Sequence, residues 1–291
     1  MSVIYNTQFV DERYSSIIEP NLYFDSVLQP GVTFTEKYEE RTGGFFVHKL
    51  GSSAVVEPEE PAQDFSDQVT TDSLIQLVFN NTFRKSEIIY GVTEASVAYN
   101  KAEAELARLV QEISEGWQVS GLAALAEEAK DSEDYENVTV ENIKEKMVSH
   151  RKMLKNAKAR PNFVIASTDV YAKILEYAGE DFIPTKNDNM LQTGNAGRWF
   201  GLTVIEANAL TTEQAKYYNY EGDLKTVDLT DVEFIMGDYE AFSAINNFEM
   251  LRMTDSERRA GALAQVETNA AYRVTNENRI LVKYKEDPEY A

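Results

Sequence analysis

The chain has 291 residues, of which 43% are hydrophobic and 11% are aromatic, and this composition excludes a largely disordered protein. It carries 28 basic and 49 acidic residues, and the formal net charge of −21 disfavours tight, sequence-independent binding to nucleic-acid phosphates. With no cysteine and only two histidines, disulfides and cysteine nucleophiles are excluded and histidine-based catalysis is disfavoured.

Residues 1–32 are predicted to form an extended N-terminal arm. Short apolar groups alternate with polar residues there, and Pro20 and Pro30 punctuate the segment. Such a segment has too little local apolar material to fold alone, so we expect it to lie on other surfaces.

Residues 33–90 are predicted to form a long two-stranded excursion. Two β-rich runs, 45–50 and 74–79, flank residues 51–72, which carry carboxylates and two prolines but no basic residue. Because about 20 structureless residues are unusual inside a compact domain, we interpret this segment as the tip of a projecting hairpin.

Residues 93–115 are predicted to form a long amphipathic helix. Thr93 is a suitable N-cap, and Leu109, Ile113 and Trp117 recur at steps of four on one apolar stripe. Two glycines, Gly116 and Gly121, are expected to break or bend it before a second helical piece over 122–130.

Residues 131–240 are predicted to form a small mixed sheet covered by helices. An acidic linker over 131–137 precedes a helix capped by Thr139, and Pro161 ends that helix. A buried strand over 163–166 then leads into a helix capped by Ser167, and further strands are expected over 202–205 and 232–236.

The remaining residues are predicted to be mostly extended. A strand is expected over 264–274, a turn over 276–278, and a returning strand over 280–284.

The signatures of common enzyme sites are missing. The sequence has no P-loop, no dinucleotide-binding glycine pattern, no H-E-x-x-H helix and no G-x-S-x-G elbow. His48 is expected on a surface or an interface. His150 is expected on a helix surface, where neighbouring cations favour its neutral ring.

Two charged regions are candidate subunit contacts. One is the acidic group between the predicted strands, and the other is the basic stretch over 144–160 with three later arginines. The residues that we expect at intersubunit contacts are Glu57, Glu59, Glu60, Asp64, Asp67, Arg252, Arg258 and Arg259. They are either solvated surfaces of little energetic weight or a docking pair that sets the register between neighbours, with Arg258 and Arg259 as the favoured receivers.

The order of these elements resembles the major capsid proteins of tailed bacteriophages, whose fold is shared with encapsulins and the herpesvirus capsid floor. Three stretches carry the resemblance: 160–167, 199–208 and 234–245. The resemblance implies an α+β fold with an N-terminal arm (1–32), an extended hairpin loop (33–90), a peripheral domain with a spine helix (91–130 and 241–291) and an axial domain (131–240).

The resemblance also implies a structural protein without enzymatic turnover or cofactor. Copies are expected to form hexamers and pentamers of an icosahedral virion shell, which encloses double-stranded DNA without sequence-specific binding. Because the arm begins at Met1, we expect a separate scaffolding protein, together with a portal. Assembly is expected in the host cell cytoplasm without a membrane.

Two alternatives stay open at this point. The first alternative, within the same fold, is an encapsulin-type shell protein. The irregular arm and the long loop favour a phage capsid over it. The second alternative, from another class, is a soluble enzyme that uses carboxylates of the central α/β region, against which the missing motifs count.

Overall fold

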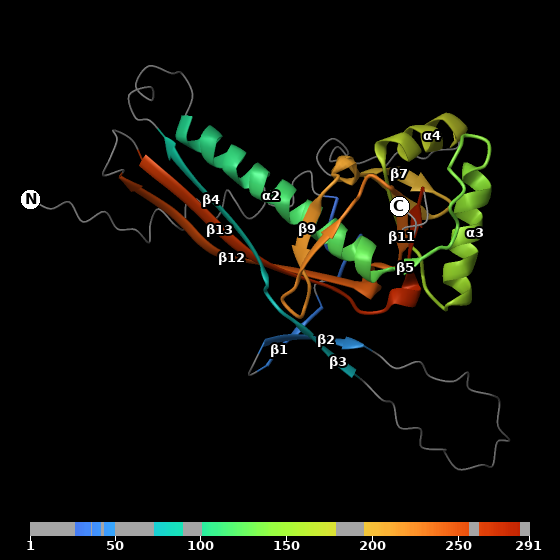
Figure 1. Ribbon diagram of the computed structural model, residues 1–291, viewed down its shortest axis with the longest axis horizontal. Helices are drawn as coiled ribbons and strands as arrows, with labels where there is room; N and C mark the ends of the chain where they lie inside the picture. Colours follow the sequence, from blue (N-terminus) through green and yellow to red (C-terminus); the bar gives the residue numbers. More distant parts are fainter. Residues whose placement is uncertain are drawn as a thin grey trace, which may run out of the picture.

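The structure is a computed structural model, and it describes residues 27–35, 37–41, 44–49, 73–89, 101–178, 195–255 and 262–285 of the chain. These residues form a long outer sheet with a helix along it, a six-stranded central sheet, and a small three-stranded sheet (Figure 1).

The outer sheet has three antiparallel strands in the order β12-β13-β4. They are β12 (Phe242–Asp255), β13 (Ala262–Val274) and β4 (Asn81–Ile89). The helix α2 (Lys101–Glu128) lies along this sheet (Figure 1). The predicted apolar stripe is confirmed, because Leu109, Ile113 and Trp117 are all buried.

The predicted break in this helix is wrong. The helix α2 runs without interruption through Gly116 and Gly121 to Glu128. A Cβ atom at Gly121 would lie 2.8 Å from Cε1 of Tyr272 and closer still to Cδ1 of Leu28. The glycine is therefore a point of close packing between the helix and its neighbours, where a larger side chain has no room.

The central sheet is mixed, as the sequence predicts. Its strand order is β5-β14-β11-β6-β8-β7, with β6 parallel to β8, β5 parallel to β14, and the other pairs antiparallel. The strands are β5 (Lys130–Asp131), β6 (Phe163–Ala166), β7 (Asn195–Trp199), β8 (Leu202–Glu206), β11 (Val232–Gly237) and β14 (Ile280–Tyr284).

Helices cover one face of this sheet and a second layer covers the other. Val164, Phe234 and Met236 pack with α3 (Ile143–Asn156) and α4 (Thr168–Ala178). Their neighbours along the strands point the opposite way, as alternation requires. That other face packs against α2 and a hairpin of β9 (Ala215–Tyr218) and β10 (Leu224–Val227).

The helix starts near the central sheet are close to those expected. Ser167 caps α4, since the backbone N–H of Val170 points to its Oγ at 3.4 Å. The helix α3 begins four residues after Thr139, whose hydroxyl accepts a hydrogen bond from the N–H of Asn142 at 3.3 Å. Thr139 thus stabilises the turn before the helix, and Asn142 holds the N-cap position.

The strand β14 has a different partner from the one expected. The predicted turn before it is present as a short 3₁₀ helix, η5 (Glu277–Arg279). The strand does not return beside β13 but pairs with β11 and β5. Its buried Ile280, Leu281 and Val282 contact both faces of the central core, which offers more apolar contact than the edge of the outer sheet.

A small sheet of β1 (Glu39–Arg41), β2 (Gly44–Lys49) and β3 (Ser73–Leu77) lies beside the outer sheet (Figure 1). The two predicted strands of the excursion are thus present and antiparallel. The segment before them differs from expectation. Val27 and Leu28, which the sequence places in an arm on other surfaces, are buried in this chain's own core.

Candidate subunit interfaces

The described part of the chain leaves the predicted contact residues untested. The acidic candidates Glu57, Glu59, Glu60, Asp64 and Asp67 lie outside the described residues, as do Arg258 and Arg259. Arg252 lies in β12, where its backbone is opposite Gln265 of β13. The docking of an acidic tip on these arginines therefore stays a prediction.

The base of the excursion is fixed to the body of the chain. Val47 and Leu77 form a small apolar cluster with Ile245 and Ala271 of the outer sheet. The rings of Phe45 and Phe79 meet edge to face, with centroids 5.2 Å apart. Residues 50–72, which include the acidic candidates, connect β2 to β3 in the sequence.

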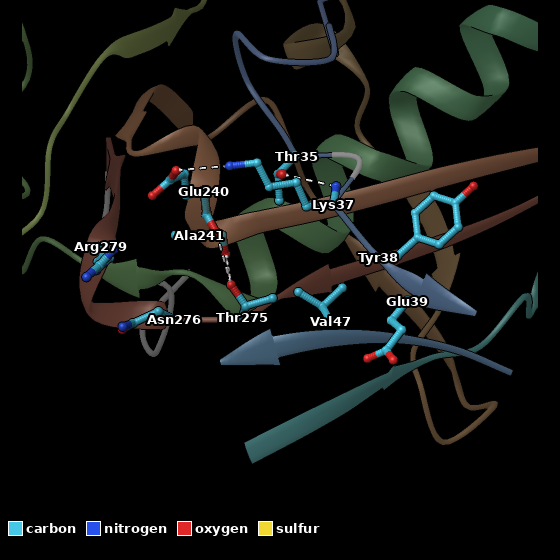
Figure 2. Close-up of a pocket in the computed structure, with 10 residues that line it drawn as sticks. All are labelled: Thr35, Lys37, Tyr38, Glu39, Val47, Glu240, Ala241, Thr275, Asn276 and Arg279. Atoms are coloured by element: carbon cyan, nitrogen blue, oxygen red, sulfur yellow. Dashed lines mark hydrogen bonds and ion pairs between the residues drawn. The ribbon is translucent and has the colours of Figure 1, made fainter. Parts of the chain in front are cut away.

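A pocket of about 540 Å³ lies where this base meets the turns at 240–241 and 275–279 (Figure 2). Lys37 pairs with Glu240 across it, with Nζ and the carboxylate oxygen 3.6 Å apart. The Thr275 hydroxyl donates to the carbonyl of Ala241 at 3.0 Å. The Lys37 and Glu240 side chains are 78% and 48% exposed, so water screens the attraction between their charges.

Ion pairs join α2 to the outer sheet. Lys85 of β4 pairs with Glu112, and Arg108 pairs with both Glu87 of β4 and Glu112. The hydrogen bond from Lys85 is the main cause that lowers the pKa of Glu112. Each pair is partly exposed and therefore contributes little stability, but together they fix the position of α2 on β4.

Buried charges in the central region are paired. Lys283 of β14 and Glu233 of β11 are almost fully buried, with Nζ and the carboxylate oxygen 3.1 Å apart. Glu233 also accepts the backbone N–H of Val138 at 2.9 Å. Lys146 of α3 pairs with Asp134 and Glu136 at 2.7 Å. These contacts tie the segment over 131–139 to α3 and the sheet.

His150 is not on a helix surface, contrary to expectation. It is 1% exposed and its ring meets Phe234 edge to face at 5.0 Å. Nδ1 lies 2.7 Å from the carbonyl of Lys146, which assigns the proton of a neutral ring to Nδ1. Burial is the main cause that lowers the pKa of this ring. The ring packs in the core, and its neutral form follows from desolvation rather than from nearby cations.

The described part of the chain holds no cluster of three or more His, Cys, Asp or Glu side chains suited to a metal ion. Among those residues, no helix is long and apolar enough to cross a membrane.

Exposed apolar side chains form a signal that the sequence analysis missed. Tyr177 and Phe200 lie on the side of the central sheet covered by α3 and α4, whereas Tyr218, Tyr220 and Leu224 lie on the β9–β10 hairpin. Large exposed apolar groups that cluster in space mark contacts with other molecules. The sequence shows the aromatic residues but not that separate segments gather them.

Comparisons with solved structures place this fold. No protein-family model matches the sequence, and no curated protein matches it. The structure is similar to that of the capsid of cyanophage P-SCSP1u, with 10% identity, a TM-score of 0.58, and 87% of this chain and 84% of that chain covered. It is also similar to the mature capsid of bacteriophage PhiM1, with 9% identity, a TM-score of 0.53, and coverage of 82% and 81%.

A third similar structure is the capsid of an empty gene transfer agent (GTA) particle, with 11% identity, a TM-score of 0.51, and coverage of 99% and 92%. These similarities extend over most of each chain. The chain therefore has the capsid fold of the tailed-phage major capsid proteins.

Proposed function

We propose that this chain is a structural capsid protein whose copies assemble into an icosahedral shell. The observation that carries the proposal is the similarity of the fold to phage capsids across most of both chains. In this proposal the subunits form hexamers and pentamers. The similar GTA capsid was computed with C5 symmetry, and five-fold symmetry is also that of a pentamer.

The proposed protein has no enzymatic turnover and needs no cofactor. The buried ionisable groups of its central region support this, because Lys283, Glu233 and Lys146 are engaged in ion pairs that hold the fold together. Groups used in that way are not available for proton transfer to a substrate. The ion pair of Lys37 and Glu240 in the pocket of Figure 2 is largely exposed to water.

The proposed shell encloses double-stranded DNA without sequence-specific binding. The net charge of −21 supports this, because an acidic wall lets a polyanion pack inside without adhering to it. A separate scaffolding protein and a portal are the further partners. The proposed location is the virion capsid, after assembly in the host cell cytoplasm.

The proposed division of the chain follows the capsid fold. It has an arm over 1–32, an extended loop over 33–90, a peripheral part over 91–130 and 241–291, and an axial part over 131–240. The strand β14 belongs to the central sheet, so the last part of the chain crosses back into the axial part.

We propose further that the acidic segment of one copy docks on the arginines near β12 of a neighbour. Reversal of Arg258 and Arg259 to Glu is expected to block assembly while the monomer stays folded. The test compares particle yield by electron microscopy with the melting temperature of the monomer. Normal particles from the Arg258→Glu/Arg259→Glu variant would remove this contact from the account.

The shell itself is tested on particles purified after expression of the chain. Nuclease-protected DNA inside particles is the result expected for a phage capsid. Protein cargo without DNA would instead identify a shell of the encapsulin type.

A further inference from the structure

The two sides of the central sheet carry exposed apolar side chains, with cations beside them on one side and two carboxylates at a turn on the other. The outer surfaces of α3 and α4 lie on one side, and the β9–β10 hairpin lies on the other. Figure 1 shows α3 and α4 to one side of β11 and β9 to the other. We name the first surface the α3 face and the second the hairpin tip.

Aromatic and cationic side chains meet on the α3 face. The rings of Tyr177 and Trp199 lie 6.1 Å apart, and those of Trp199 and Phe200 lie 4.7 Å apart. The Lys144 ammonium lies 5.9 Å from the centroid of the Tyr177 ring. Arg151 belongs to the same face, because its Nη2 approaches Gly201, next to Phe200, and it lies two helical turns from Lys144.

The turn that carries Phe200 is strained. Phe200 has a φ of 51° and Gly201 has a φ of 76°, so both residues of this two-residue turn are in the left-handed region. Such a turn prefers Asn or Gly at its first position, and a bulky residue there costs about 1–2 kcal/mol. The phenyl ring is nevertheless 37% exposed. An exposed aromatic side chain at a strained position is typical of a contact site.

Helix α3 is strongly basic on an acidic protein, whereas α4 adds the exposed carboxylates Asp169 and Glu176 to the same face. Residues 143–160 include seven basic residues and one acidic residue, in a chain with a net charge of −21. Lys146 is taken up by Asp134 and Glu136. By contrast, no described residue forms an ion pair with Lys144, Arg151 or Lys155, which share one stripe of the helix.

The hairpin tip carries carboxylates at its turn. Tyr218 and Leu224 are paired across the two strands and are 44% and 51% exposed. Between them lie Tyr220, Glu221 and Asp223, which are also exposed. The turn therefore combines an apolar surface with two carboxylates, and the strands beside it carry the exposed Lys216 and Lys225.

Hydrogen bonds hold the hairpin tip rigid. Asn81 of β4 accepts the N–H of Tyr218 at 2.8 Å and donates to its carbonyl at 3.0 Å. Asn219 accepts the N–H groups of Glu221 and Asp223 at 3.0 and 2.8 Å. The Arg273 guanidinium stacks on Tyr220 at 3.7 Å. A surface fixed in this way loses little entropy when a partner binds.

We propose that the α3 face of one copy binds the hairpin tip of the next copy around a ring. The partner is a second copy because the two surfaces are complementary in charge and both are apolar at the centre. Since they lie on opposite sides of the central sheet, the contact is head to tail and repeats from copy to copy until a ring closes. This inference rests on the proposed capsid function and names the surfaces that join subunits within a hexamer or pentamer.

Charge reversal on each surface tests the contact. The α3-face variant is Lys144→Glu/Arg151→Glu, and the hairpin-tip variant is Glu221→Lys/Asp223→Lys. Each is expected to weaken association at least tenfold in sedimentation velocity, because like charges then face each other. A Lys130→Glu control, with the reversal on neither surface, is expected to assemble normally. Since all these side chains are at least partly exposed, the melting temperatures are expected to stay unchanged.

The decisive experiment restores the charge complementarity of the two surfaces. A chain with all four substitutions has complementary surfaces again and is expected to regain hexamers and pentamers. In an equal mixture of the two double variants, opposite charges meet only where a subunit of one variant binds a subunit of the other. That mixture is expected to form hexamers without pentamers, because alternation closes only rings with an even number of subunits.

The outcomes separate this contact from the proposed function. Normal rings from either double variant would overturn the contact while the shell survives. Failure of the fourfold variant to reassemble, with its fold intact, would overturn it as well. A wild-type chain that forms no ring or particle under any condition would instead overturn the capsid proposal. If the α3-face variant unfolds, the hairpin-tip variant decides the contact alone.

Discussion

At the scale of single residues, the buried pair of Lys283 and Glu233 links β14 to β11 in the middle of the central sheet. Removal of one partner leaves an uncompensated charge in the core. We expect Lys283→Met to lower the free energy of unfolding by about 3–5 kcal/mol, and the double variant Lys283→Met/Glu233→Gln to lose less. Denaturant unfolding measures both. Lys37→Met, which breaks an exposed pair, is the control and is expected to cost less than about 1 kcal/mol.

His150 predicts a dependence of stability on pH. Burial lowers its pKa below the ordinary value, so the unfolded chain takes up a proton at a higher pH than the folded chain. Stability is therefore expected to fall as the pH drops from 7 to 5, through the unfolded pKa of about 6.5. The charge of Asp134 raises the pKa of this ring, whereas those of Lys283 and Lys146 lower it. The paired carboxylates Asp134 and Glu136, whose pKa values are lowered, act only at lower pH.

The His150→Leu variant is expected to flatten this slope, as measured by melting temperature across the pH series. His48→Gln, which alters the other histidine, is expected to keep it. An unchanged slope in His150→Leu would show that the ring titrates normally in the folded chain.

At the scale of elements, the two glycines of α2 have different surroundings. A Cβ at Gly121 would clash with Leu28 and Tyr272, whereas at Gly116 the nearest atom is a Phe83 ring carbon at 3.3 Å. We expect Gly121→Ala to cost about 1–3 kcal/mol in denaturant unfolding, because the packed neighbours must move. Gly116→Ala is the matched control. Its expected change is small, because up to about 1 kcal/mol of helix propensity offsets the tight contact. Equal losses in both variants would contradict this explanation.

These elements also show what the sequence can predict. Period and composition identify the strands 163–166, 202–205 and 232–236, because each is a short apolar run between turn residues. The continuity of α2 and the partner of β14 depend on contacts with residues far along the chain. Local rules treat a glycine as a break and consecutive strands as a hairpin, and both rules fail here because tertiary packing decides. The same limit hides the α3 face, which separate elements build.

At the scale of the whole molecule, the subunit has a packed core of its own and presents its proposed contact surfaces outward. The core includes Val27, Leu28 and Phe34, so the start of the described chain belongs to the body. The strands β2 and β3 at the base of the excursion pair with each other and pack on the outer sheet. We therefore expect contacts between copies to stabilise the subunit further. The melting temperature is then expected to depend on protein concentration.

Mass photometry of the purified chain over a range of concentrations, with electron microscopy of the same samples, tests whether copies of this chain assemble into a shell. The expected result is that the fraction of the chain in five- and six-membered rings and closed particles increases with concentration. A monomer or a small fixed oligomer at every concentration, with or without scaffolding protein, would contradict it.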